Sequence, residues 1–183
     1  MAQASTVYRF TIDVSHVDRG YYETLDVRTA RHPSENIDYL LTRVIALALN
    51  KEEGLEFSKG LCEPDEPAIK RVAPGGEVLT WIEIGNPAAN RLHKASKASR
   101  RVAVYTYKDP QNILRECEGE RIHRADGIEI TAIDPRFLKD LAVTLDRANA
   151  WTLLANDGEL TISVGEESFT TTLQPHRLAG RDR

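Results

Sequence analysis

The segment LTWIEIGNPAANRLHKASKAS, residues 79–99, constrains this chain more than any other part of the sequence. Trp81 and Glu83 alternate with isoleucines, and this period of two predicts a strand with one apolar face and one face that carries a carboxylate. An Asn-Pro pair then predicts the start of a helix over residues 87–101, along which basic side chains recur at spacings of three or four, at Arg91, Lys94, Lys97 and Arg101. A strand-borne glutamate therefore faces a basic helix across a short loop, which suggests a metal site that handles phosphate groups.

The sequence before this segment predicts a hairpin and a helix. Residues 7–15 and 20–31 both alternate aromatic or β-branched side chains with polar ones, and the HVDRG turn between them predicts an antiparallel pair. A helix is expected to start in the PSE sequence at 33–35, with Ser34 as its N-cap. Its apolar side chains lie on one stripe, at Ile37, Leu40, Leu41, Val44, Ile45 and Ala48.

Short strands are predicted on both sides of the central segment. Residues 55–61 and 68–72 form two of them, and the Pro-Gly-Gly turn at 74–76 leads into the central strand. The VAVYTY sequence at 102–107 follows the basic helix as another strand. From Ser34 onward, the expected order of elements is therefore α-β-β-β-α-β.

The last third of the chain predicts two helices and several strands. Asp134 and the proline after it indicate a capped helix start, and the Asn-Asp-Gly turn at 156–158 is a strong hairpin signal. The expected elements are helices at 110–117 and 134–148, strands at 127–132, 151–155, 159–164 and 168–173, and a frayed tail at 179–183.

Composition limits the class of protein. The net charge of −4 argues against a protein that binds polyanions over its whole surface, so contact with nucleic acid must be a local patch. Cys62 and Cys117 form no CxxC pair, which predicts reduced thiols rather than a zinc knuckle or a disulfide scaffold. No signal peptide and no apolar run of about 20 residues is found. We therefore expect a single domain over residues 1–183 in a soluble, cytoplasmic protein without membrane contact.

The candidate chemistry is hydrolysis of a phosphodiester. That reaction needs carboxylates that hold one or two hard cations, and Asp65 and Glu83 are of this type on segments that can become adjacent strands. Lys94 can stabilise the developing charge or orient water, and Arg91 can hold a phosphate. Motifs of nucleotide-binding loops, zinc proteases and serine hydrolases are absent from the sequence.

Five short motifs carry a family resemblance. The chain resembles the YaeQ family in RHPSE at 31–35, FSKGLC at 57–62, DEP at 65–67, WIEIGNP at 81–87 and RxxKA at 91–95. Pro64-Asp65, followed by Glu83-Ile84-Gly85 within an α-β-β-β-α-β order, is also similar to the core of the PD-(D/E)xK nuclease superfamily.

The resemblance implies a fold and a site. The implied fold is an α/β protein with a mixed central sheet, a restriction-endonuclease-like core at about residues 34–107, and extensions that contain N-terminal and C-terminal β-hairpins. Asp65 and Glu83 match the metal-binding acids, with Glu66 assisting, and the implied cofactor is Mg²⁺ or Mn²⁺. The pattern departs at Gly85, where the superfamily has lysine, and Lys94 on the next helix can supply that amine. YaeQ proteins, as a family, are similar in fold to nucleases, but the family itself has no established reaction.

Each candidate site residue also has a plainer interpretation. Glu83 can be a hydrogen-bonded or solvent-facing strand residue, and Asp65 and Glu66 can be turn residues between two prolines. Lys97, proposed to bind substrate together with Arg91, belongs to a basic run that can equally be a solvated helix face.

The same holds for three residues elsewhere. His32 and Glu35 stand at the start of the first long helix, where capping is the plainer role, and they are secondary candidates because the first helix of such nucleases often contributes an acid. Trp81 can stack on a base or belong to the core.

Three functions follow from the sequence. The first is a metal-dependent nuclease, and the second is a non-catalytic module on the same scaffold that binds nucleic acid or another protein. The third is a structural protein in which the acids and bases form a buried ion-pair network between strand and helix.

Overall fold

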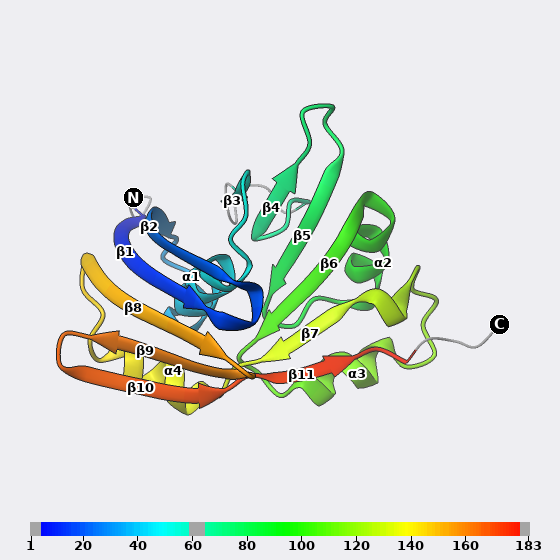
Figure 1. Cartoon of the computed structure of the whole chain (residues 1–183). Coiled ribbons are helices and arrows are strands. Elements are labelled where there is room, and N and C mark those ends of the chain that lie inside the picture. Colours follow the sequence, from blue (N-terminus) through cyan, green and yellow to red (C-terminus); the bar gives the residue numbers. More distant parts are fainter. Residues whose placement is uncertain (1–4, 59–64, 180–183) are drawn as a thin grey trace. The chain divides into compact units, whose positions relative to one another are not determined.

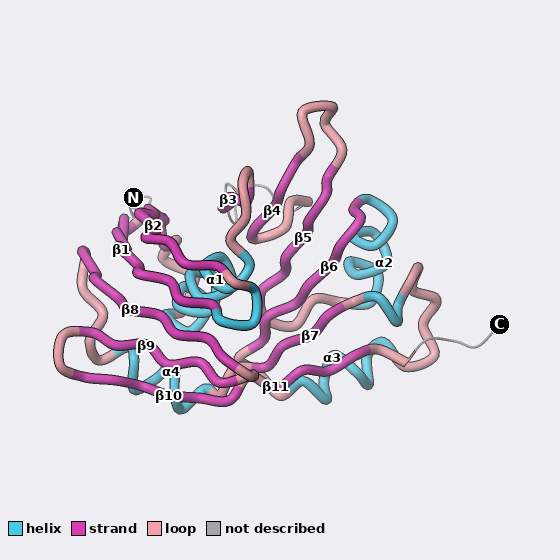
Figure 2. Tube along the Cα trace, viewed as in Figure 1, coloured by secondary structure: helices cyan, strands magenta, loops and turns pink. Residues whose placement is uncertain are grey.

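The computed structural model of the chain describes residues 5–58 and 65–179. The chain forms two compact units (Figure 1 and Figure 2). One unit comprises Met1–Leu49 with Ile133–Leu173, and the other comprises Asn50–Ala132 with Gln174–Arg183. Each unit has its own mixed β-sheet, and the expectation of a single domain over residues 1–183 stays a prediction.

The first unit contains a five-stranded sheet in the order β10-β9-β8-β1-β2. The predicted hairpin of β1 and β2 is confirmed, β8 lies parallel to β1, and β9 and β10 continue the sheet with antiparallel pairings. In Figure 1, the helices of this unit lie behind the sheet. The elements are β1 (Thr6–His16), a 3-10 turn (Val17–Arg19), β2 (Tyr21–Arg31), α1 (Ile37–Asn50), α4 (Pro135–Ala142), β8 (Ala148–Asn156), β9 (Glu159–Val164) and β10 (Glu167–Thr172).

Helix α1 is buried on all sides over most of its length. All residues from Leu40 to Asn50 are buried, so the predicted apolar stripe covers only part of the buried surface. The predicted N-cap is wrong, because α1 begins at Ile37 and the Asn36 side chain accepts a hydrogen bond from the Tyr39 amide at 2.7 Å. The Ser34 amide instead donates to the His32 ring at 3.2 Å, outside the helix.

The second unit contains a six-stranded sheet in the order β11-β7-β6-β5-β4-β3. Strands β3, β4 and β5 are antiparallel, β5, β6 and β7 are parallel, and β11 closes one edge antiparallel to β7. The elements are β3 (Leu55–Phe57), β4 (Ile69–Val72), β5 (Val78–Ile84), α2 (Ala89–Ala98), β6 (Ser99–Thr106), α3 (Pro110–Cys117), a 3-10 turn (Ala125–Gly127), β7 (Glu129–Ala132) and β11 (Gln174–Arg177).

The described residues form a mixed α/β protein with two mixed sheets and four α-helices. The predicted order α-β-β-β-α-β is confirmed by α1 and the elements from β3 to β6. The predicted terminal hairpins do not extend the central sheet, because β1 pairs with β8 and the two hairpins form a sheet of their own. Strand β11 has no counterpart in the prediction, and the helix expected over 134–148 ends at Ala142.

Helix α2 is shorter at both ends than predicted. It begins at Ala89 and ends at Ala98, and β6 begins at Ser99, where it pairs with Val78 of β5. Arg100 and Arg101 therefore lie on a strand and not on the basic helix. The side chain of Arg124 donates at 2.6 Å to the backbone oxygens of Ser96 and Ser99, which binds the loop before β7 to this helix end.

The core of the second unit lies between its sheet and its helices. Trp81 is buried against Leu92 and Ala95 of α2 and Ile113 of α3, so the core interpretation of this tryptophan is confirmed. Over residues 5–58 and 65–179, no helix combines the length and the hydropathy that a membrane span requires.

Candidate functional site

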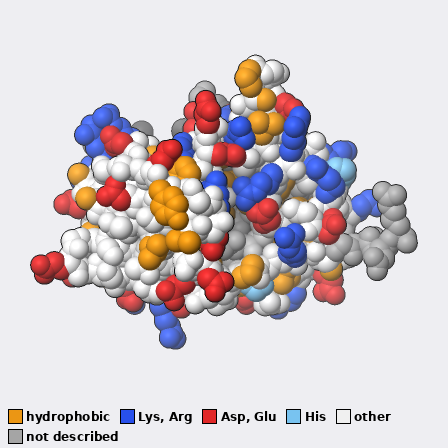
Figure 3. All heavy atoms as spheres, in the orientation of Figure 1, with side chains coloured by type: hydrophobic (Ala, Val, Ile, Leu, Met, Phe, Trp, Pro, Cys, Tyr) orange, Lys and Arg blue, Asp and Glu red, His pale blue; other side chains and the backbone are white. Residues whose placement is uncertain are grey.

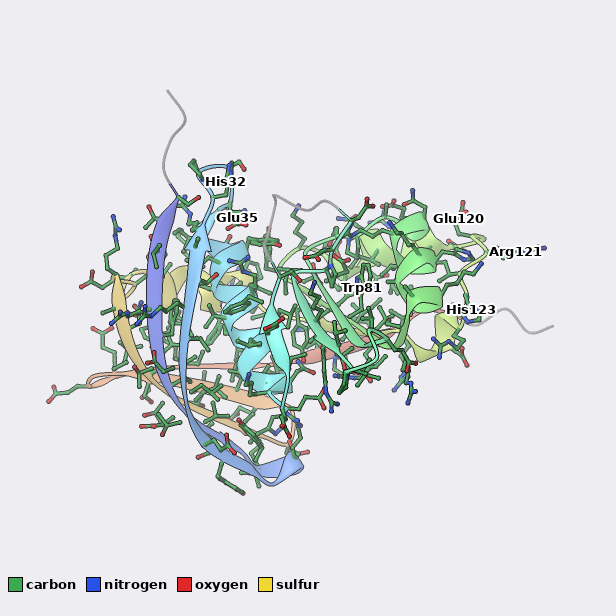
Figure 4. The ribbon with its side chains drawn as sticks, turned by 90° about the horizontal axis from the view of Figure 1, so that it is seen from above. His32, Glu35, Trp81, Glu120, Arg121 and His123 are labelled. Atoms are coloured by element: carbon green, nitrogen blue, oxygen red, sulfur yellow. The ribbon has the colours of Figure 1, made fainter. Side chains whose placement is uncertain are left out.

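Glu83 lies on the face of β5 that packs against α2. Trp81, two residues earlier on the same strand, is buried among α2 side chains, and residues two apart on a strand share a face (Figure 4). The strand ends at Ile84 and is followed by Gly85, whose φ of 91° is a left-handed conformation that glycine adopts without strain. The Gly85 amide donates to the Tyr105 carbonyl at 2.8 Å, which fixes the chain where it leaves the sheet toward α2.

The Glu83 carboxylate is buried and hydrogen-bonded. Its Oε1 accepts from Trp81 Nε1 at 2.6 Å and from Arg91 Nε at 2.7 Å, and its side chain is 7% exposed. Burial raises the pKa of Glu83, while the hydrogen bonds from Trp81 and Arg91 act in the opposite direction. The bond to Trp81 was not predicted, although the two residues lie at positions i and i+2 of one strand and this spacing is a local sequence signal for it.

Arg91 links the strand acid to the segment before β4. Its Nη2 donates to the backbone oxygen of Glu66 at 2.7 Å, while its Nε binds Glu83. One guanidinium from α2 therefore holds residues from β5 and from the turn at 65–68 together.

Asp65 and Lys94 form a second pair one helical turn further along α2. Lys94 Nζ lies 2.6 Å from Asp65 Oδ1, and the side chains are 57% and 88% exposed, respectively. The pKa of Asp65 is lowered mainly by the hydrogen bond from Lys94 and next by the charge of Lys94. The charge of Arg91 lowers it further, by a smaller amount. Asp65 is therefore an ionised, solvent-exposed carboxylate beside two cations.

The other predicted residues of the second unit occupy simpler positions. Glu66 Oε1 lies 2.6 Å from Lys70 Nζ, within its own segment. Lys97 is exposed on α2 and forms no ion pair with a described residue. Pro64 and Cys62, which belong to the family motifs, lie outside the described residues, and Cys117 is a buried free thiol.

The donor types in this cluster suit a hard divalent cation. Asp65 and Glu83 provide carboxylate oxygens, and Mg²⁺ is commonly held by one or two carboxylates together with water and substrate phosphates. Among residues 5–58 and 65–179, no three His, Cys, Asp or Glu side chains form a group that could hold a metal. A metal at this cluster would therefore rely on two carboxylates, with water and substrate completing its coordination.

His32 and Glu35, which are labelled in Figure 4, belong to the first unit. The cluster of Asp65, Glu83, Arg91 and Lys94 belongs to the second. Glu35 is buried, and its Oε2 accepts from the His32 amide at 3.3 Å while its Oε1 lies 3.9 Å from Arg43 Nη1. Both residues order the loop between β2 and α1, which is a structural role, but they lie before the helix, and Asn36 accepts the hydrogen bond at its start.

A polar network on β6 and β7 was not predicted. Arg101 Nη2 lies 2.6 Å from Glu129 Oε2 and 2.9 Å from Asn50 Oδ1, and the Asn50 amide donates to the hydroxyl of Tyr105 at 2.8 Å. Its hydrogen-bonded partners are separated by 28 to 55 positions, so no local pattern could have joined them.

Comparison with known proteins identifies the family. The YaeQ protein family matches residues 1–173. This chain belongs to the YaeQ family. The uncharacterised protein YaeQ of Escherichia coli K12 is 26% identical over 174 residues, which are 94% of this chain and 96% of that protein. The YaeQ protein of Salmonella typhi is 26% identical over 164 residues, or 89% and 91% of the two chains.

Two crystal structures of YaeQ proteins share the fold. The YaeQ protein from Xanthomonas axonopodis pv. citri is 28% identical, with a TM-score of 0.88 over 96% of this chain and 100% of that chain. The YaeQ protein from Pseudomonas syringae is 29% identical, with a TM-score of 0.85 over 98% and 99% of the two chains. The family resemblance inferred from the motifs is thus confirmed along nearly the whole sequence.

Proposed function

We propose that this YaeQ protein is a metal-dependent nuclease that hydrolyses phosphodiester bonds of nucleic acid. The main observation is that the site residues chosen from the sequence converge, because Lys94 binds Asp65 and Arg91 binds Glu83. Residues three apart on a helix are neighbours, so α2 presents both pairs on one side. The Arg91 charge also lowers the pKa of Asp65, which is consistent with one electrostatic cluster.

The arrangement of the second unit supports this proposal. Three antiparallel strands precede α2, and β6 then runs parallel to the strand that bears Glu83. Together with α1, this is the α-β-β-β-α-β order that the nuclease resemblance implies. We propose that residues 34–107 correspond to a restriction-endonuclease-like core.

The residues have distinct roles in the proposed reaction. Asp65 and Glu83 would hold Mg²⁺ or Mn²⁺ with Glu66 nearby, and the bound cation would supply Lewis-acid activation of water and phosphate. Lys94, 2.6 Å from Asp65, would stabilise negative charge that develops on the phosphate. Arg91 would orient a phosphate oxygen with its planar guanidinium, and the exposed Lys97 would contact the nucleic-acid backbone.

The decisive experiment uses Asp65, because its exposed side chain can be changed without opening the core. Asp65→Asn is compared with Glu77→Gln, which removes the same charge from an exposed pair with Arg100 in the same unit. We expect the wild type and Glu77→Gln to cleave DNA or RNA in the presence of Mg²⁺ or Mn²⁺. Asp65→Asn should lose about 100-fold or more of this rate. The proposal fails if the wild type cleaves no single- or double-stranded substrate with either metal, or if Asp65→Asn cleaves equally well.

A second candidate is a module on a nuclease-derived scaffold that binds nucleic acid or another protein without catalysis. It is favoured by Gly85, whose φ of 91° suits glycine where the superfamily has lysine. It is also favoured by Glu83, because Oε1 already accepts two hydrogen bonds and burial raises the pKa of its carboxyl. Binding of nucleic acid by the wild type without cleavage under every metal condition would select this function. Either function is proposed for the cytoplasm, because the spacing of the two cysteines predicts reduced thiols.

A further inference from the structure

The first unit exposes one face of its sheet to solvent. On β1 and β8, buried side chains such as Phe10, Ile12 and Leu153 alternate with exposed ones, and β2, β9 and β10 continue the exposed side. In Figure 1 this face is turned to the viewer, with α1 and α4 behind it. We call it the open face, and define it by Val7, Arg9, Thr11, Asp13, Tyr22, Thr24, Asp26, Arg28, Ala150, Thr152, Leu154, Asn156, Glu159, Thr161, Ser163, Ser168, Thr170 and Thr172.

Much of the open face is uncharged and partly apolar. Val7, Tyr22 and Leu154 are 54%, 60% and 44% exposed. On β9 and β10 the hydroxyl groups of this face bond one another, at 2.9 Å between Thr161 and Thr170 and at 2.7 Å between Ser163 and Ser168. Figure 3 shows mostly uncharged surface over these strands. Because the hydroxyl groups are partly satisfied within the sheet, this surface can be covered by another protein at a small desolvation cost.

Four charges of the open face are arranged in separate rows on β1 and β2, and a fifth, Glu159, lies on β9. Arg9 and Arg28 lie directly opposite each other, and like charges in this position repel. Asp26 and Asp13 follow at the next positions of the same face, opposite Thr11 and Thr24. None of the four forms an ion pair within the described part of the chain, and the Asp13 carboxylate accepts only a hydrogen bond from Thr24 at 2.5 Å.

We propose that the open face is the contact between two copies of this chain. On β1 and β2 two arginines and two aspartates balance, and Glu159 on β9 adds one negative charge to the face. This charge pattern fits a second copy of the same face and not a polyanion. A two-fold axis that runs across the strands, between the arginines and the aspartates, brings the arginines of each copy against the aspartates of the other. Both sets of ion pairs then form together, as an isologous interface requires, and the two sheets stack face to face.

The test is a charge exchange measured by sedimentation velocity on the full chain. The wild type is expected to dimerise with rising concentration. Arg9→Glu with Arg28→Glu makes all four charges negative, and Asp13→Arg with Asp26→Arg makes them all positive. Each double variant should therefore dimerise about tenfold or more weakly than the wild type. An equimolar mixture of the two should regain the dimer, because every contact again joins opposite charges.

Two further variants complete the design. Arg136→Glu with Lys139→Glu changes the net charge equally on exposed positions of α4, behind the sheet, and should dimerise like the wild type. Leu154→Lys places a charge in the apolar part of the open face and leaves the two arginines and two aspartates in place, so it should be monomeric; it tests the interface even if a charge variant fails to fold. A wild type that stays monomeric would overturn the proposal. So would a dimer that is insensitive to all open-face variants, or folded charge variants that do not associate when mixed.

Discussion

At the scale of single residues, two acid–base pairs differ in how deeply they are buried, although their basic partners, Arg91 and Lys94, lie one turn apart on α2. The side chain of Glu83 is 7% exposed and that of Asp65 is 88% exposed. Burial raises the pKa of Glu83, whereas the Lys94 hydrogen bond lowers the pKa of Asp65. A buried carboxylate depends on its cation, and an exposed ion pair contributes little to stability. The Glu83–Arg91 pair therefore contributes to the packing of β5 against α2 in addition to the role proposed for it, and Asp65 with Lys94 is the pair that solvent reaches.

This difference predicts a pH-dependent effect of Arg91→Met. At pH 7 the variant should lose about 2 kcal/mol of unfolding free energy, because buried Glu83 keeps its charge without a cation. Since burial raises the pKa of Glu83, the folded state binds a proton more tightly than the unfolded state. That stabilisation is complete below the ordinary carboxyl pKa and is lost as pH rises through the raised pKa. Urea denaturation should therefore show the stability of the variant falling between pH 4 and pH 7 more steeply than that of the wild type.

Lys94→Met serves as the matched control on the same helix. Its partner Asp65 is exposed, so water solvates that carboxylate when the lysine is removed. We expect an unchanged unfolding free energy at each pH. Equal losses in the two variants would contradict the distinction between a buried and an exposed pair.

At the scale of elements, helix starts depend on whether the capping side chain is engaged elsewhere. Asp109 and Asp134 each precede a proline and accept hydrogen bonds from backbone amides at 2.9 and 2.8 Å, so α3 and α4 begin at the predicted residues. Asn86 also precedes a proline, but its Oδ1 accepts from Thr106 of β6 at 2.9 Å. Helix α2 therefore begins later, at Ala89, without a side-chain cap.

The uncapped start of α2 predicts a stabilising substitution. Ala88 is the N-cap residue, has an extended backbone and is exposed, so Ala88→Ser should add about 0.5–1 kcal/mol to the unfolding free energy. Asn86→Ala should instead cost about 1 kcal/mol, because Thr106 loses its acceptor. Chemical denaturation measures both effects. A neutral Asn86→Ala together with a destabilising Ala88→Ser would contradict a helix that begins at Ala89.

At the scale of the whole molecule, the charge distribution restricts where nucleic acid can bind. The net charge is −4. Arg100 and Arg101, expected on the basic helix, lie on β6, where they pair with Glu77 and Glu129. Lys97 remains on α2 as an exposed cation that no described carboxylate neutralises. The binding of nucleic acid that we propose would therefore be local and sensitive to salt.

Lys97→Ala is the corresponding test. If α2 contacts the phosphate backbone, this variant should weaken nucleic-acid binding for all sequences alike and reduce the slope of log affinity against log salt by about 1. Fluorescence anisotropy over a series of KCl concentrations gives the slope. Lys139→Ala, on α4 in the other unit, removes the same charge and should leave the slope unchanged. The prediction fails if the slope is unchanged in Lys97→Ala or falls equally in both variants.

Local sequence determined most of the elements and the family. The hairpin of β1 and β2, the Asn-Asp-Gly hairpin of β8 and β9, and the starts of α3 and α4 all follow from alternation, turn residues and caps that act within a few residues. The same sequence patterns and the family resemblance selected Asp65, Glu83, Arg91 and Lys94, which the fold brings together.

The tertiary structure alone decided what depends on residues far apart in the chain. Strand β1 pairs with β8 through contacts such as Arg9 with Ala148, which is why the terminal hairpins form their own sheet. Arg101, which was predicted on a helix, lies on a strand because β6 pairs with β5 from Ser99 onward. Burial of Glu83 and exposure of Asp65 also depend on what packs against each residue. Alternation and capping are local signals, whereas strand pairing and burial arise only when distant segments meet.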